Sequence, residues 1–323
     1  MVLAAIAAES VAAYDETTGK PLELAWGILF FAPLYGGPAV LIRETARRAR
    51  LGWPAMLLMA AGFGLLEAGV IDQSLFSTDY REIEDWEELM RGTFVEPPGL
   101  SAYLAQAFVV GHVIYSYCAP IAIVEALRPA DAHEPWLRWR GLAVVCVLYL
   151  AVAAIVLGDH LATEPSHASP GQVAGALLVA AAFVAIGVAL GRRAPGSSRG
   201  RAPRPWLVLA VSFVVASLHG AVDATWPGVA QVAAILALGT ALLVRASRMS
   251  GWGLEHVAAV AAGALLSLAA IAFTYEPLIG EVTAGRKYAH NAVMLTLIAA
   301  ISALAIRRAR RSSAVNASQG SLR

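Results

Sequence analysis

The sequence predicts an all-α protein, a polytopic transmembrane helix bundle of about nine spans. Of its 323 residues, 58% are hydrophobic and only 15% are charged, whereas soluble domains carry about 25% charged residues. Long runs of Ala, Val, Leu and Ile recur along the chain, and such runs are typical of helices that cross a membrane. Arginine-rich loops alternate with acidic or neutral loops. The positive-inside rule therefore places the N-terminus outside and the C-terminus in the cytoplasm.

The expected spans follow the apolar runs in chain order. They cover residues 22–42, 54–72, 101–127, 141–158, 172–190, 207–225, 229–244, 254–274 and 288–306. Tryptophans stand at several span ends, where interfacial aromatic residues are enriched. These features predict a multi-pass protein of the inner (plasma) membrane. Its partner is the lipid bilayer, and we expect no nucleic-acid partner.

We expect one transmembrane domain over residues 1–311, followed by a Ser/Asn-rich tail, 312–323, that is disordered. A basic connector rich in Pro, Gly and Ser, 192–206, would join two halves of the domain, 1–191 and 207–311. The two cysteines fall inside apolar helices, where small buried side chains are expected rather than a disulfide or a metal pair.

Two acidic segments are expected outside the membrane. Residues 1–21 form a short, slightly acidic leader without the basic region of a signal peptide. The longest loop, 73–100, has seven acidic residues against two arginines, and we expect it to contain a short surface helix. The loop is most simply a solvated face. A lid over an outer cavity is the alternative.

Ionisable residues inside three expected spans are the candidate site. Glu67 lies within an apolar helix, where a charge costs about 2.5–3.5 kcal/mol on insertion scales, so it is a functional hypothesis by default. At 1.5 Å per residue, Glu67 would lie roughly 7 Å, His112 about 16 Å and His219 roughly 10 Å below the outer surface. Asp223 follows one turn above His219. We expect all four to face a shared, outward-facing cavity.

Local spacing supports this interpretation. His219 and Asp223 are an i, i+4 pair, which places both side chains on one helix face, where a carboxylate can orient an imidazole. His112, Tyr115 and Ser116 share a face in the same way. Three glycines thin the helix around Glu67 and let a neighbour approach closely; they are Gly62, Gly64 and Gly69.

Two chemistries fit these residues. In the first, Glu67 is the general base or acid that activates water, and a histidine stabilises the developing oxyanion. In the second, Glu67, His112, His219 and Asp223 bind zinc, the one candidate cofactor. No His-Glu-x-x-His sequence is present, so the zinc hypothesis depends on the matching depth alone. The structural alternative is that these groups only form hydrogen bonds between helices.

Three short segments resemble motifs of the PrsW-type and CPBP-type glutamate-dependent intramembrane proteases. Gly62-Phe63-Gly64-Leu65-Leu66-Glu67 is similar to the Glu-bearing motif, Phe108 to Ser116 to the middle motif, and His219 to Asp223 to the late motif. The Glu-Glu pair of that family is missing, since Ala32 to Gly37 holds no acid. The resemblance implies an intramembrane peptidase-like hydrolase, or an inactive relative, with Glu67 as base.

Two functions therefore stay open at this point. One is a hydrolase that acts on a membrane peptide or small-molecule substrate. The other is a transporter, or an ion- or lipid-binding protein, that uses the same Glu/His/Asp cavity.

Overall fold

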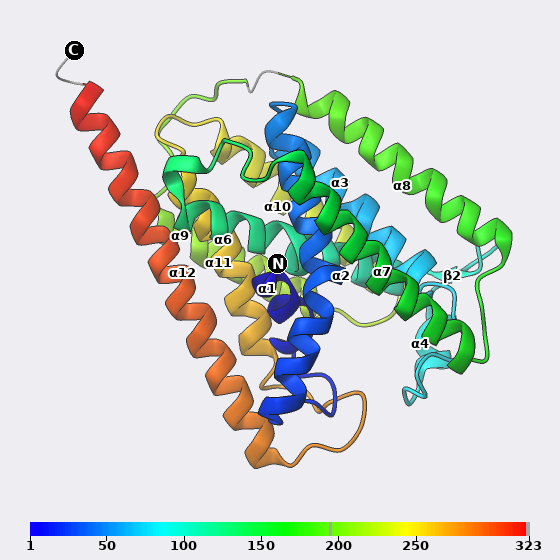
Figure 1. Ribbon diagram of the computed structural model, residues 1–323. Coiled ribbons are helices and arrows are strands. Elements are labelled where there is room, and N and C mark those ends of the chain that lie inside the picture. Colours follow the sequence, from blue (N-terminus) through cyan, green and yellow to red (C-terminus); the bar gives the residue numbers. More distant parts are fainter. Residues whose placement is uncertain (194–195, 321–323) are drawn as a thin grey trace.

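The computed structural model describes residues 1–193 and 196–320, and these residues are mostly helical (Figure 1). Among them, eight helices are long and apolar enough to cross a membrane. The expected all-α membrane fold is thus confirmed. The number of spans and their orientation stay predictions.

The long helices coincide with the expected spans. They are α2 (Pro21–Arg48), α3 (Trp53–Leu66), α5 (Ala102–Gly111), α6 (Ala119–Leu127), α7 (Trp139–Thr163), α8 (Pro170–Gly191), α9 (Pro205–Gly220), α10 (Trp226–Ser247), α11 (Leu254–Ile271) and α12 (Ala284–Gly320). The expected span 207–225 is the exception. Its helix, α9, has 16 residues, which is about 24 Å of helix, shorter than a hydrocarbon core of about 30 Å.

Two of the spans contain a π-helical segment, in which hydrogen bonds join residues five apart. The second span continues from α3 into η2 (Glu67–Ile71), and the third runs through α5, η3 (His112–Cys118) and α6. A third segment of this type, η1 (Ile6–Ser10), follows the short helix α1 (Val2–Ala5) near the N-terminus.

The N-terminal segment differs from the expected outer leader, because it folds into the bundle. Figure 1 shows α1 in the middle of the molecule, beside α2, and α1 packs against both α2 and η3. Ala5 and Ala7 are fully buried there. Small side chains allow this close packing, and Gly36 of α2 has no Cβ where the Met1 backbone passes.

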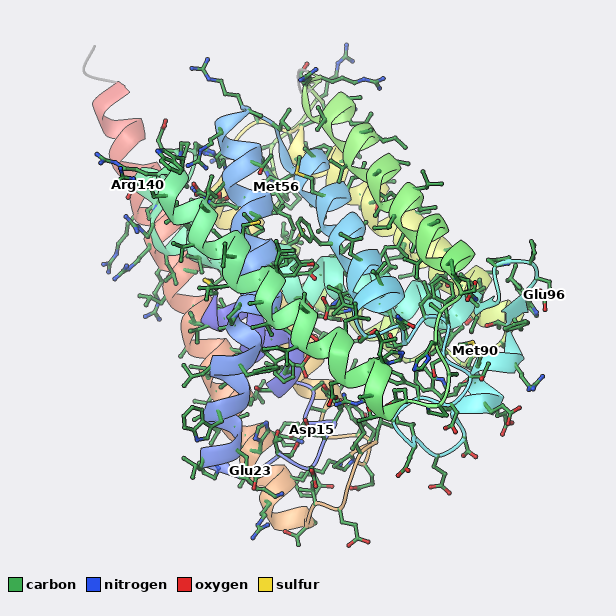
Figure 2. The ribbon with its side chains drawn as sticks, turned by 45° about the vertical axis from the view of Figure 1, so that its right-hand side comes forward. Asp15, Glu23, Met56, Met90, Glu96 and Arg140 are labelled. Carbon is green, nitrogen blue, oxygen red and sulfur yellow. The ribbon has the colours of Figure 1, made fainter. Side chains whose placement is uncertain are left out.

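The basic helix ends gather at one end of the bundle. The Gly52 amide donates to the Gly191 carbonyl over 3.4 Å, which joins the start of α3 to the end of α8. Arg308 of α12 donates to the Leu127 carbonyl at the end of α6 over 3.1 Å. Figure 2 shows Arg140 at this end of the molecule.

The acidic and neutral loops gather at the opposite end, where Figure 2 shows Asp15 and Glu23. The Leu278 amide donates to the Tyr14 carbonyl over 2.7 Å, and the hydroxyls of Ser77 and Ser166 lie 2.8 Å apart. Charge is therefore sorted between the ends as the loop pattern predicts. Which end faces the cytoplasm stays a prediction from the positive-inside rule.

The loop 73–100 is packed rather than fully solvated. The expected surface helix is present as α4 (Trp86–Gly92), and the short strands β1 (Phe94–Val95) and β2 (Leu100–Ser101) pair antiparallel behind it. Trp86 is buried against Tyr80 and Phe108, so the loop has its own apolar cluster.

Two boundaries expected from composition fall partly outside the described residues. The connector 192–206 includes residues 194–195, and the tail includes 321–323, which the structure does not describe. Helix α12 continues through Gly320, so it includes residues 312–320 of the expected tail. The two halves share a core, because α11 packs against both α6 and η3.

Candidate functional site

The three π-helical segments bring polar side chains to one region of the bundle. Segment η1 contributes Glu9, η2 begins at Glu67, and η3 begins at His112. Segment η3 packs against η1 and against α3, the helix that leads into η2. Such segments are rare in proteins, but many of those that occur lie at functional sites. Their wider turn displaces side chains and backbone groups from the regular helical pattern. We call Glu9, Glu67, His112 and the tyrosines around them the π-segment site.

Glu67 is buried in this site. Its side chain is 1% exposed, and its Oε2 atom has no hydrogen-bond partner among the described residues. The charged groups with the largest electrostatic effect on it are Asp72 and Glu9, both of them acids. An ionised carboxylate that is buried in this way costs several kcal/mol, and protonation removes that cost.

Glu9 approaches the same region from the N-terminal segment. It accepts a hydrogen bond from the Tyr14 hydroxyl, and Tyr35 of α2 is a second hydroxyl close to it. The guanidinium of Arg81, in the loop that follows η2, acts on Glu9 as a favourable charge. Two acids, Glu9 and Glu67, therefore share this region, and the cation that favours the charged form of Glu9 lies in a loop.

Tyrosine rings surround His112 and Glu67. The His112 imidazole stacks on Tyr35 on one side and on Tyr117 on the other, with ring centroids 5.8 Å and 6.0 Å apart. Tyr35, Tyr117 and Tyr149 lie close enough to Glu67 to interact with it electrostatically. The Tyr117 hydroxyl is buried and has no partner among the described residues, so it is a second unpaired polar group in this site.

The position of His112 agrees with its expected helix face. Its Nδ1 lies 3.1 Å from the Ser116 hydroxyl, which confirms the pairing one turn apart. A methyl group added at Gly64 would lie 2.8 Å from the His112 Cβ. The absence of a side chain at Gly64 is therefore what lets η3 approach the helix that carries Glu67, as the glycine spacing suggests.

Asp72 links the π-segment site to the acidic end of the bundle. It follows η2 directly, and its Oδ1 accepts from the Ser74 amide over 2.9 Å and from the Ser74 hydroxyl over 2.8 Å. Burial raises the pKa of Asp72, although the Ser74 hydrogen bonds and the charge of Arg81 oppose the rise. Burial and the Asp72 charge also raise the pKa of Tyr80. Polar groups thus extend from Glu67 to the loop surface.

The structure does not place His219 and Asp223 in this site. Helix α9 ends at Gly220, so the expected i, i+4 pairing of the two on one helix face is wrong. Asp223 is an exposed residue of the turn before α10, whose first residues include Pro227, and its backbone carbonyl accepts from Thr225. A new helix that begins at Trp226, with its own Thr225 cap, leaves no room for α9 to continue.

His219 is half-buried near the end of α9, and its Nε2 has no partner in the described part of the chain. Helix α9 packs mainly against α11 and α10, whereas Glu67 and His112 lie on η2 and η3. Of the four expected residues, Glu67 and His112 thus lie on packed segments, whereas His219 and Asp223 lie at the end of α9 and beyond it.

The described residues contain no group of three or more His, Cys, Asp or Glu side chains that could hold a metal ion. The expected set of Glu67, His112, His219 and Asp223 is split between two places. These residues do not fit a zinc site, which needs about four ligands in one place.

Several functional candidates were not found from sequence. Glu9 was assigned to an outer leader, although the small residues around it allow close helix packing. Glu125 lies within the expected span 101–127, yet it is fully buried and binds two arginines of α2. The signal that could have found it is the i, i+4 spacing of Arg43 and Arg47, which puts both on one face in need of an acid.

Comparison with known proteins gives one result. The model of an uncharacterized membrane protein family matches residues 1–218. No curated protein and no solved structure matches the chain. The matched part includes all three π-helical segments and ends one residue before His219.

Proposed function

Because the chain belongs to this uncharacterized membrane protein family, we propose its function from its own residues: it is a proton-linked membrane transporter in which Glu67 takes up and releases the proton. The observation that carries the proposal is the burial of Glu67, whose Oε2 has no hydrogen-bond partner among the described residues, beside two further acids. A buried ionisable group inside a membrane protein is typical of ion pathways and proton relays.

A proton-binding site has two structural requirements, and the π-segment site meets both. The site needs a group whose charged form is costly and a polar route to one surface. Glu67 supplies the first, since its burial favours the neutral acid. Asp72, Ser74 and Tyr80 supply groups that lead toward the acidic end. A proton needs no cavity, and neutralising Glu67 removes its repulsion with Glu9 and Asp72.

A hydrolase is the second candidate, and one observation favours it. Gly64 lets His112 lie against the helix that carries Glu67, so an acid and an imidazole share one region. General acid–base catalysis needs the two groups within hydrogen-bond reach of a substrate or a water. No hydrogen bond joins Glu67 to His112 among the described residues, and His112 instead pairs with Ser116. The resemblance to glutamate-dependent proteases stays part of this second proposal.

The protonation of Glu67 can be tested directly by infrared spectroscopy on the full chain in liposomes. A carboxylic acid that stays protonated at pH 7 has a carbonyl stretching band that a carboxylate lacks. We expect this band in the unaltered protein, its loss or reduction in Glu67→Gln, and no change in the matched control Glu84→Gln, whose side chain is exposed. A band that Glu67→Gln leaves unchanged would contradict the proposal.

Function is tested in the same liposomes with an internal pH dye. We expect an imposed pH gradient to decay faster with the unaltered protein and with Glu84→Gln than with Glu67→Gln. Incubation with a single-span reporter peptide separates the two candidates. Cleavage that depends on Glu67, without any proton flux, would favour the hydrolase and overturn the transporter.

A further inference from the structure

We propose that a buried cluster of ion pairs between α2 and α6 is a gate that closes the π-segment site toward the basic end of the bundle. The cluster consists of Arg43, Glu44 and Arg47 from α2 and Glu125 from α6, and we call it the ion-pair gate. This inference rests on the proposed function, because a gate requires a site that alternates between two sides.

The ion-pair gate joins the two helix ends through charged hydrogen bonds. Glu125 accepts from Arg43 Nε over 3.1 Å, from Arg47 Nε over 2.8 Å and from Arg47 Nη2 over 2.5 Å. Glu44 accepts from Arg43 Nη1 over 2.6 Å. Both carboxylates are 0% exposed, so each is paired where an unpaired charge would be very costly.

The gate also holds the loop that follows α6. The Trp136 and Leu137 amides donate to Glu44 over 2.9 Å and 3.0 Å. Arg43 donates to the Asp131 and Ala132 carbonyls and lies with its guanidinium carbon 3.4 Å from the centre of the Trp136 ring. Three separate segments therefore meet at one charged centre. Buried ion pairs contribute little net stability compared with apolar packing, and their best-attested roles are in register and switching.

Both helices have hinge features level with the π-segment site. In α2, Gly36 and Gly37 are followed by Pro38, which lacks the N–H that would bond the Leu34 carbonyl. In the third span, η3 ends at Cys118 and Pro120 follows in α6. Kinks in helices occur at such prolines and π-helical segments. The helix ends beyond these points could therefore tilt as rigid pieces without disturbing the rest of α2 and η3.

Between the hinges and the ion-pair gate lies an apolar layer. Ala39 and Ile42 of α2 are buried there, as are Ile121 and Ile123 of α6. Toward the acidic end a proton on Glu67 meets polar groups such as Asp72, whereas the buried side chains of this layer, between the hinges and the ion-pair gate, are apolar. Release toward the basic end therefore requires α2 and α6 to separate, and that separation breaks the contacts of Glu125 with Arg43 and Arg47.

The experiment measures how fast a water-soluble maleimide labels a cysteine hidden behind the gate. The native cysteines, both free, are replaced by Cys118→Ala and Cys146→Ala, and Ile42→Cys is added in the full chain in detergent. We expect Glu125→Gln to increase the labelling rate at least about tenfold, because loss of one partner from a buried pair exceeds the 1.4 kcal/mol of a tenfold change. Glu87→Gln, whose ion pair with Arg91 is exposed, is the matched control and should leave the rate unchanged.

A second variant distinguishes opening of the gate from misfolding of the protein. Arg47→Gln removes one partner but leaves Arg43 paired with Glu125, so we expect an intermediate labelling rate. The exposed position Glu134→Cys should label equally in every background and report an intact sample. If Ile42→Cys stays protected in both Glu125→Gln and Arg47→Gln, while they elute like the parent protein, the ion pairs are only structural and the gate is overturned.

The infrared band of Glu67, measured in the same samples, separates the two proposals. Protected Ile42→Cys with a normal Glu67 band means that the gate fails and the proton site stands. Faster labelling without any Glu67 band means that the ion pairs do hold the helices together, but that the proton site beside them is wrong.

Discussion

The imidazole of His112 lies nearly parallel to the phenol ring of Tyr35, with their centroids 5.8 Å apart and their planes inclined by 21°. The same imidazole also stacks on Tyr117, at an angle of 23°. His112 is therefore packed against two aromatic rings, and its Nδ1 lies 3.1 Å from the Ser116 hydroxyl. An imidazole packed in this way is better placed to hold the tyrosine rings around Glu67 than to contact a substrate.

We expect His112→Ala to lower the free energy of unfolding by about 1–3 kcal/mol, because it removes two aromatic pairs worth about 0.5–1.5 kcal/mol each. Unfolding in mixed detergent micelles measures this. His133→Ala is the control, since His133 is exposed, and it should change stability by less than about 0.5 kcal/mol. Equal effects from the two variants would show that the stacking contributes nothing.

The sequence was sufficient to predict the class of fold and the place of Glu67. Apolar runs identify helices because lipid allows little else, and a carboxylate in such a run is costly whatever its neighbours are. Glu9 could not be predicted in the same way. Its segment is too short to span a membrane, and only the tertiary structure shows that it packs inside the bundle beside α2.

His219 and Asp223 show why depth along a helix is a weak guide to contact. Residues at equal depth on different helices meet only if the helices are neighbours and the residues face each other. Helix α9 packs mainly against α11 and α10, and it ends before Asp223. Neither fact follows from spacing along the chain, because helix neighbours are set by packing between residues far apart in sequence.

The N-terminal segment packs against α2 at Gly36, where a side chain would block it. A methyl group there would lie 2.2 Å from the Met1 Cα and 2.6 Å from the Met1 carbonyl oxygen. We expect Gly36→Ala to displace this segment and to cost about 1–3 kcal/mol, as overpacking does. Protease cleavage near Glu9 should become faster, because the displaced segment is exposed.

Gly27→Ala is the matched control for Gly36→Ala. It lies in the same helix, and a methyl group added there meets nothing within 4 Å. We expect it to leave proteolysis unchanged. Equal cleavage rates in Gly36→Ala and Gly27→Ala would mean that the N-terminal segment is not held against α2.

The hydrogen bond from Tyr14 to Glu9 leads to another prediction. Tyr14→Phe keeps the ring but removes the donor, so the partly buried carboxylate loses a partner. We expect a loss of about 1–3 kcal/mol in the free energy of unfolding. Tyr288→Phe is the control, because the Tyr288 ring is largely exposed and its hydroxyl has no hydrogen bond among the described residues. A loss no greater than that of the control would show that Tyr14 does not support Glu9.

Asp72 predicts a pH dependence whose sign follows from its environment. Burial raises the pKa of Asp72 in the folded protein above its ordinary value. The folded state therefore holds this proton more tightly than the unfolded state does. The contribution of Asp72 to stability is fully present below the pKa of the unfolded chain, and it is lost as the pH rises through the raised, folded pKa.

We expect Asp72→Asn to remove this loss, because the amide stays neutral while its oxygen can still accept from Ser74. Stability measured from acidic to neutral pH should then fall less steeply in Asp72→Asn than in the unaltered protein. Asp79→Asn, at an exposed position of the same loop, should follow the unaltered protein. A parallel fall in all three would contradict the assignment, since the proton would then be bound elsewhere.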